Sequence, residues 1–314
     1  MIVTLVSRFL EHELAKRRLI ERAVTKRGTT VATTEECTSH TEIIWASLSA
    51  LAAEAMPPDP ALTAPWVELV LRSEVGWRAR CKPHGYAGDY RLMELFYDLE
   101  HVAGQRPGRS VSENLVDHFL VQSDGVRLVR ERARRLEAIV TQAAKDGAQT
   151  ILDVGGGGAR YVRRALEALQ SPRPQIFIYD QDLTLPHFWA AEVPQAISSK
   201  VQVISKPVKA IHTNTPSQPF ALVLSSGLFD YLDQATAQDL AAHLWSLTAP
   251  GGRLVIANIL ETERAEARLL RHLLDWTIVN RSDADMTSLL PGVDPATYTA
   301  VPEFDLGIVE YRKD

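Results

Sequence analysis

Short apolar runs alternate with amphipathic stretches after residue 150. The apolar runs, several of which end in glycines, serines or carboxylates, are residues 150–158, 175–182, 201–205, 220–226 and 252–258. The stretches between them have helical spacing and cover residues 160–170, 185–198, 234–248 and 262–276. Short strands that alternate with helices predict right-handed βαβ units and a parallel sheet. The last segment, residues 297–314, predicts two strands with no helix between them, and therefore an antiparallel pair at the sheet edge.

The first half of the chain predicts helices and no strand. Apolar residues recur every three or four positions over residues 5–24, which is one face of a helix. Further helices are expected at residues 41–55, 66–80, 91–102 and 114–147, of which the last stretch forms one or two. The segment GQRPGRS at residues 104–110 predicts a loop. We therefore divide the chain into a helical N-terminal or lid region, residues 1–147, and an α/β domain, residues 148–314.

Composition narrows the class of protein. The chain has 314 residues and a net charge of −5, which argues against a nucleic-acid partner bound through bulk electrostatics. Its two cysteines, Cys37 and Cys81, cannot build a disulfide framework or a cysteine metal cage, so we expect a cytoplasmic protein. No window approaches 18 apolar residues, so no membrane span is expected. Residues 12–16 read HELAK and not the zinc motif HExxH, so no metal is expected.

A glycine-rich turn and a later carboxylate carry the first chemical signal. ILDVGGGGAR, at residues 151–160, runs from a predicted strand through glycines into a predicted helix. Such a turn lets the backbone approach a ligand closely, although tight packing of helix on sheet would also explain it. Asp180 ends the next strand, 25 residues after Gly155, which is the spacing at which an acid accepts hydrogen bonds from ribose hydroxyls. The alternative is that Asp180 or Asp182 caps the following helix.

The order of these pieces resembles the class I methyltransferases that use S-adenosylmethionine (SAM). Asp153 with the glycines at 155–158 matches the first motif of that family, Asp180 the second, and LTAPGGRLVIAN at 247–258 the turn before the fifth strand. The resemblance implies a Rossmann-like, seven-stranded α/β sheet whose last strand is antiparallel, joined to an N-terminal helical lid. It also implies SAM as cofactor. The residues expected to bind it are Asp153, Gly155, Gly157, Tyr179, Asp180, Ser226 and Gly227.

A narrower resemblance spans nearly the whole chain. CKPHGYAGDYRLMELFY (81–97), SSGLFDYLD (225–233) and HLLDWTIVNR (272–281) resemble a bacterial GYAGD-containing methyltransferase subfamily. That subfamily is linked to 3-hydroxypalmitic acid methyl ester biosynthesis and to natural-product clusters. Gly85 and Gly88 would let the lid touch a ligand. The residues expected to act in catalysis are Tyr86, Asp89, Tyr90 and Tyr231, the alternative being that Asp89 caps the 91–102 helix and the tyrosines are core.

Three functions remain open from the sequence. The first is transfer of the SAM methyl group to a small acyl, hydroxyl or carboxyl acceptor, with His84 as a candidate base or else a structural histidine. The second follows from a similarity to azetidine-2-carboxylate synthases, in which the α-amino group of SAM attacks its own Cγ and methylthioadenosine leaves. The candidate rings around the sulfonium are Tyr86, Tyr90, Tyr179, Phe229, Tyr231 and Trp276. The third is a SAM-binding protein without catalysis.

Two further expectations concern partners and surface. We expect a small-molecule substrate, no nucleic acid and no membrane, and leave a homodimer open. Arg130, Arg132, Arg134 and Arg135 lie on one predicted helix and are expected to form a solvated basic face.

Overall fold

The computed structural model describes residues 64, 66–68, 70–101, 111–170, 173–216, 218–262 and 264–314. The helices expected at residues 5–24 and 41–55 and the loop expected at 104–110 lie outside these ranges. Within them, no helix is both long enough and apolar enough to cross a membrane.

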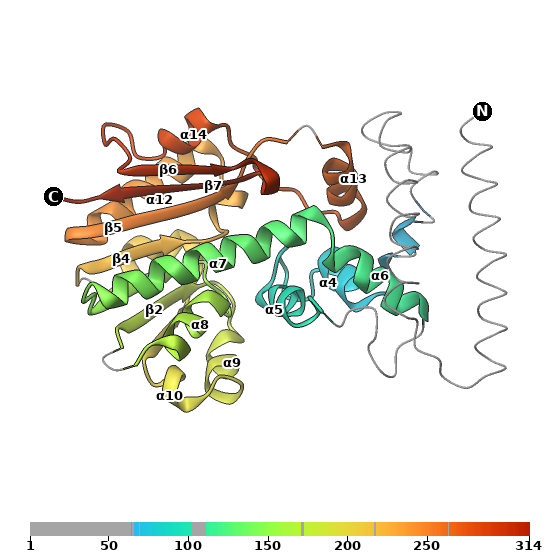
Figure 1. Cartoon of the computed structure of the whole chain (residues 1–314), viewed down its shortest axis with the longest axis horizontal. Coiled ribbons are helices and arrows are strands. Elements are labelled where there is room, and N and C mark those ends of the chain that lie inside the picture. The colour runs from blue at the N-terminus through green and yellow to red at the C-terminus, as the bar shows by residue number, and fades with distance from the viewer. Residues whose placement is uncertain are drawn as a thin grey trace.

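A mixed sheet forms the centre of the α/β domain (Figure 1). Seven strands of the described chain follow the order β3-β2-β1-β4-β5-β7-β6. They are β1 (Thr150–Val154), β2 (Gln175–Asp180), β3 (Val201–Ser205), β4 (Phe220–Ser225), β5 (Thr248–Ile259), β6 (Thr297–Val301) and β7 (Leu306–Arg312). Strands β1 to β5 pair in parallel, and β7 is antiparallel to both β5 and β6. The predicted Rossmann-like sheet of seven strands with an antiparallel closing pair is confirmed.

Helices cover both faces of this sheet (Figure 1). α7 (Asp124–Lys145) and α8 (Arg160–Ala168) pack on one face, and α12 (Gln234–Leu247) and α14 (Asp283–Thr287) pack on the other. The helical stretch expected at 185–198 forms two helices, α9 (Leu185–Ala191) and α10 (Gln195–Ser198). The two helices are separated at Pro194, which is the N-cap of α10. Proline has no N–H with which to continue α9.

The helices that precede the sheet build a second buried cluster. α4 (Glu74–Cys81), α5 (Tyr90–Asp98) and α6 (Val111–Val121) pack with α13 (Ala265–Leu274) through side chains such as Val75, Phe96 and Leu273. Figure 1 shows these helices beyond the carboxyl ends of the parallel strands. In open α/β sheets, ligands bind at that end of the strands, so these helices face the side where a site is expected.

Arg281 fastens the loop that follows β4 to the end of β5. The side chain is 1% exposed, and its Nη1 donates to the Phe229 carbonyl at 2.7 Å and to the Asn258 Oδ1 at 2.5 Å. Its Nη2 donates to the Leu232 carbonyl at 2.7 Å, and its Nε donates to the Gln234 Oε1 at 3.0 Å. The planar five-donor guanidinium suits this task, because it reaches several acceptors at once from a buried position.

Replacing Arg281 by methionine should destabilise the protein by about 3 kcal/mol, since an unsatisfied buried acceptor costs about 1–3 kcal/mol. Arg281→Lys should lie between methionine and wild type, because lysine keeps the charge but loses the fork. Urea unfolding followed by circular dichroism measures both changes. Unfolding of Arg281→Met at the wild-type midpoint would show that the loop does not depend on this side chain.

Candidate functional site

The glycine turn, residues 155–158, stands where the strand order reverses. β1 lies between β2 and β4, so the connections from the carboxyl ends of β1 and β4 lead to different parts of the sheet and leave a crevice between them. Gly155 and Gly157 have φ of 71° and 54°, in the left-handed region that favours glycine. A Cβ on Gly155 would lie 2.8 Å from the Leu228 Cβ, so the turn packs against the loop after β4 without room for a side chain.

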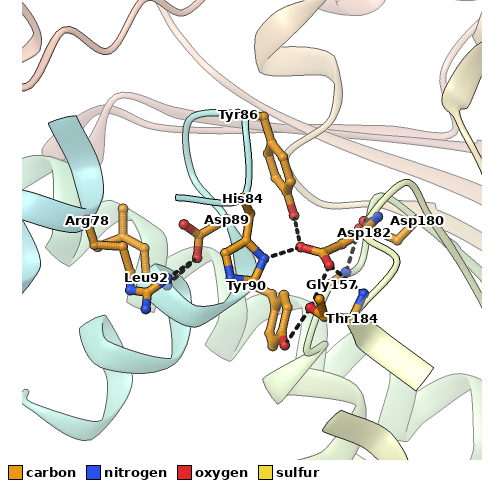
Figure 2. Close-up of polar contacts among 10 residues, drawn as sticks. All are labelled: Arg78, His84, Tyr86, Asp89, Tyr90, Leu92, Gly157, Asp180, Asp182 and Thr184. Carbon is orange, nitrogen blue, oxygen red and sulfur yellow. Dashed lines mark hydrogen bonds and ion pairs between the residues drawn. The ribbon is translucent and has the colours of Figure 1, made fainter. Parts of the chain in front are cut away.

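Asp180 ends β2 beside the glycine turn (Figure 2). Its Oδ2 accepts from the Gly157 N–H at 3.0 Å and its Oδ1 accepts from the Asp182 N–H at 2.9 Å. Burial raises the pKa of this carboxyl, against the lowering effect of these backbone donors. Each carboxylate oxygen has a further lone pair, so Asp180 can accept additional hydrogen bonds from a ligand.

Asp153 lies beneath the glycine turn. Its Oδ2 accepts from the Tyr161 hydroxyl at 2.6 Å, and its Oδ1 has no hydrogen-bond partner within the described ranges. A Cβ on Gly156 would lie 2.4 Å from the Asp153 Oδ2, so this carboxylate supports the turn from below. Burial raises the pKa of Asp153 to about 7. The structure places Asp153 outside the cavity lining.

A cavity of about 240 Å³ opens at the glycine turn. The predicted site residues that line it are Tyr86, Tyr90, Gly155, Gly157, Asp180, Ser226, Gly227 and Tyr231. Its other walls come from α7 and α13, through residues such as Val129 and Leu270. The cavity therefore joins a polar end at Asp180 to an apolar end at α13.

The lid loop, residues 82–89, is fastened to the end of β2 by Asp182 (Figure 2). The Asp182 Oδ2 accepts from the Tyr86 hydroxyl at 2.9 Å and lies 2.6 Å from the His84 Nδ1. The Asp182 Oδ1 accepts from the Thr184 N–H at 2.8 Å and from its hydroxyl at 2.7 Å. Burial raises the pKa of Asp182, but the hydrogen bonds from Thr184, His84 and Tyr86 outweigh it, and the net shift is downward. Asp182 is therefore held as a carboxylate that binds the lid.

Aromatic side chains close the lid side of the cavity. The Tyr90 hydroxyl lies 3.0 Å from the Thr184 Oγ1, and the Tyr231 hydroxyl accepts from the Trp276 Nε1 at 2.9 Å. A Cβ on Gly88 would lie 2.6 Å from the Tyr231 hydroxyl, so the absence of a side chain there permits the lid contact. Burial raises the pKa values of Tyr86 and Tyr231, so both are neutral phenols at neutral pH.

Two further predicted site residues, and the candidate base, lie outside the cavity lining. Asp89 is 1% exposed, caps α5 by accepting from the Leu92 N–H at 3.0 Å, and pairs with Arg78 at 3.3 Å. Tyr179 is buried on the α12 face of the sheet and donates to the Pro207 carbonyl at 3.0 Å. His84 is paired with Asp182, as described above.

The predicted basic face of α7 is wrong for two of its four arginines. Arg130 and Arg132 are buried, whereas Arg134 is half exposed. The Arg132 Nη1 donates to the Asp230 Oδ2 at 2.8 Å, and Arg132 lines the cavity. The position of Arg132 could have been predicted from the sequence. It lies three residues after Val129 and four before Leu136, which places it on the apolar, sheet-facing side of the helix.

Within the described ranges, no group of three or more histidine, cysteine, aspartate or glutamate side chains is arranged to hold a metal ion.

The free energy of unfolding of Asp153→Asn, relative to that of the wild type, should rise with pH. The native state keeps the Asp153 proton up to about pH 7, whereas the unfolded chain releases it near about pH 4. The native protein therefore binds more protons in this window, and its free energy of unfolding falls as pH rises. Asparagine has no such proton, so the free energy of unfolding of the variant should rise relative to that of the wild type between about pH 4 and 7 and then level off.

Urea unfolding at three pH values tests this prediction. The control is Asp239→Asn, because Asp239 is an exposed carboxylate on α12. A constant difference across the window would contradict it.

Solved structures at low sequence identity share this fold. A possible exported protein from Bordetella parapertussis is 17% identical, with a TM-score of 0.60 over 88% of this chain and 98% of that one. A candidate methyltransferase from Thermobifida fusca is 16% identical, with a TM-score of 0.50 over 83% of this chain and 100% of that one. No protein-family model and no curated protein matches the chain. The chain thus has the class I methyltransferase fold.

Proposed function

We propose that this protein binds SAM at the glycine turn and transfers its methyl group to a small-molecule acceptor. The glycine turn and Asp180 stand at the switch point of the sheet, where this type of fold binds its ligands. The ribose hydroxyls would donate to the free lone pairs of the Asp180 carboxylate. The glycines at 155–158 line the cavity beside Asp180 without side chains of their own, so the residues present fit a nucleoside cofactor.

The aromatic wall suits the positive charge of a sulfonium. Tyr86, Tyr231 and Trp276 line the cavity, and an aromatic face attracts a cation by about 0.5–1 kcal/mol at an exposed site and by more where water is excluded. Because both phenols are neutral, they present rings and hydroxyls without adding negative charge. SAM supplies an electrophilic methyl group, and the chain's own residues orient the reactants and exclude water.

The observation that carries methyl transfer is the lining of the cavity. Besides Asp180 and the aromatic wall, it includes Leu270, Leu274 and Phe304, which offer an apolar end for an acceptor. A reaction on SAM alone needs no such compartment. We further propose, from the GYAGD resemblance, that the acceptor belongs to natural-product biosynthesis.

A second reaction, cyclisation of SAM, fits one specific observation. Two carboxylates of the cavity, Asp230 and Glu94, are paired with Arg132 and Arg160. These pairs make both carboxylates poor candidates for a catalytic base. Cyclisation needs no strong base, because the neutral α-amino nitrogen forms a bond to Cγ while the Cγ–S bond breaks. The bond electrons leave with methylthioadenosine, and the ammonium proton goes to solvent. Azetidine-2-carboxylic acid is the other product.

Mass spectrometry after incubation with SAM alone separates the two reactions. Methyl transfer predicts intact SAM, with S-adenosylhomocysteine (SAH) formed only when hydroxyl or acyl acceptors are added. Methylthioadenosine with an equal amount of azetidine-2-carboxylic acid would overturn methyl transfer in favour of cyclisation. Binding of SAM without turnover under either condition would leave a non-catalytic SAM-binding protein.

Asp180→Asn should weaken SAH binding about 10- to 100-fold. The substitution keeps an oxygen for the Gly157 N–H but removes the charge that strengthens hydrogen bonds from the ribose, a difference of about 1.5–3 kcal/mol. Titration calorimetry with SAH measures it. Asp239→Asn serves as the matched control, since Asp239 is an exposed carboxylate on α12 away from the cavity. Equal affinities for the wild type and Asp180→Asn would contradict the assigned ribose contact.

A further inference from the structure

One helix face turns toward the apolar end of the cavity. The α13 residues that line the cavity are Ala267, Leu270, Arg271 and Leu274, at the spacing of a single helix face. Three of these four side chains are apolar, as expected for the inner face of an amphipathic helix. Arg271 is the exception, and a cation on such a face needs an explanation.

Arg271 has no carboxylate partner. Its Nη1 donates to the Asn280 Oδ1 at 2.8 Å, and no carboxylate of the described residues lies within ion-pair distance. The other N–H groups of this guanidinium have no hydrogen-bond partner in the described part of the chain. Partial burial lowers the pKa of Arg271, against the raising effect of the charges of Asp305 and Asp230.

The two carboxylates whose charges act on Arg271 from a distance are each paired with another arginine. Asp230 pairs with Arg132 at 2.8 Å, and Asp305 pairs with the Arg264 Nε at 3.5 Å. The other arginines of the cavity, Arg132 and Arg160, each have an acidic partner. Among the arginines that line the cavity in the described part of the chain, Arg271 is therefore the one without a carboxylate partner.

These donors fit one ligand chemistry. A guanidinium presents two parallel N–H groups that match the two oxygens of a carboxylate. Asp305 and Asp230 lie near enough to act on the Arg271 charge, so a dianionic phosphate would meet more repulsion than a carboxylate. Leu270, Leu274 and Phe304 surround the same end of the cavity and suit an apolar body.

We propose that Arg271 binds the carboxylate of an acceptor that has an apolar body, so that the acceptor is a small carboxylic acid. This inference rests on the proposed SAM-dependent methyl transfer. It names the acceptor class that the α13 end of the cavity takes. SAM also has a carboxylate, in its methionine part, so the test separates the two sources.

The first arm of the test measures cofactor binding. Titration calorimetry with SAH and with methylthioadenosine, which lacks the carboxylate, compares the wild type, Arg271→Met and Arg271→Lys. The proposal predicts SAH affinities within about 2-fold for all three proteins. A loss of 10-fold or more for SAH in Arg271→Met, with methylthioadenosine unchanged, would assign Arg271 to the cofactor and overturn the proposal. Wild-type protein that does not bind SAH at all would contradict the proposed function itself.

The second arm measures acceptor binding to SAH-saturated protein. Phenylacetate and hexanoate are titrated beside their neutral amides, phenylacetamide and hexanamide, and ligand-observed NMR gives each Kd. The wild type should prefer the acids by about 10-fold, Arg271→Met should lose that preference, and Arg271→Lys should keep part of it. Arg312→Gln, which removes an exposed charge at the end of β7, is the matched control and should behave as the wild type.

The outcomes of this arm are decisive in both directions. Preference for the acids in the wild type and the control, lost in Arg271→Met, supports the proposal. No preference in the wild type, or a preference that survives in a folded Arg271→Met, overturns it while SAH binding still upholds the proposed function. Thermal melts confirm folding, and the lysine variant answers the question if the methionine variant does not fold.

Discussion

The site depends on a turn that has no room for side chains. Three separate parts of the chain converge on residues 155–158: Leu228 from the loop after β4, Tyr90 from the start of α5, and Asp153 from the strand below. Each would clash with a Cβ on one of the glycines, at 2.4 to 3.0 Å. Glycine here is therefore a packing requirement for the lid and for the neighbouring loop, as well as a means for a ligand to reach the backbone.

Buried charged side chains, Asp230 and Arg281 among them, hold the loop after β4 in place. Asp230 accepts from Arg132 of α7 and, at 2.8 Å, from the Ile259 N–H at the end of β5. Its own carbonyl accepts from the Val279 N–H at 2.7 Å, and Arg281 binds the carbonyls on either side of it. Burying these groups is tolerated because their hydrogen-bonding capacity is met by partners from three elements. The loop is thereby fixed against the glycine turn, and Ser226 and Gly227 line the cavity.

The sequence predicts the sheet and the glycine turn well, because both depend on local pattern. The spacing of Asp180 predicts its position beside the glycine turn, and the cavity lies at the carboxyl ends of the strands. Tyr179 was assigned to the cofactor beside Asp180, but neighbours on a strand point to opposite faces, and Tyr179 packs toward α12. For Asp89, the capping role that the sequence left open is the contact observed.

The pairing of Arg132 and Arg271 at the site is not predictable from the sequence, because the pairing of an arginine depends on contacts distant in the chain. Arg132 and its partner Asp230 are 98 residues apart.

Asp180 and Asp182 belong to one short segment, yet they bind different things. The Asp182 N–H donates to the Asp180 carboxylate, while the Asp182 carboxylate accepts from Tyr86 and Thr184 and pairs with His84. Both side chains thus have their rotamers set by the protein, and the segment links the lid to the end of β2. Preorganisation of this kind removes an entropic cost from ligand binding, because the carboxylates have already lost their conformational freedom on folding. The lid contact of Asp182 and the proposed cofactor contact of Asp180 therefore lie on one short segment that hydrogen bonds hold in place.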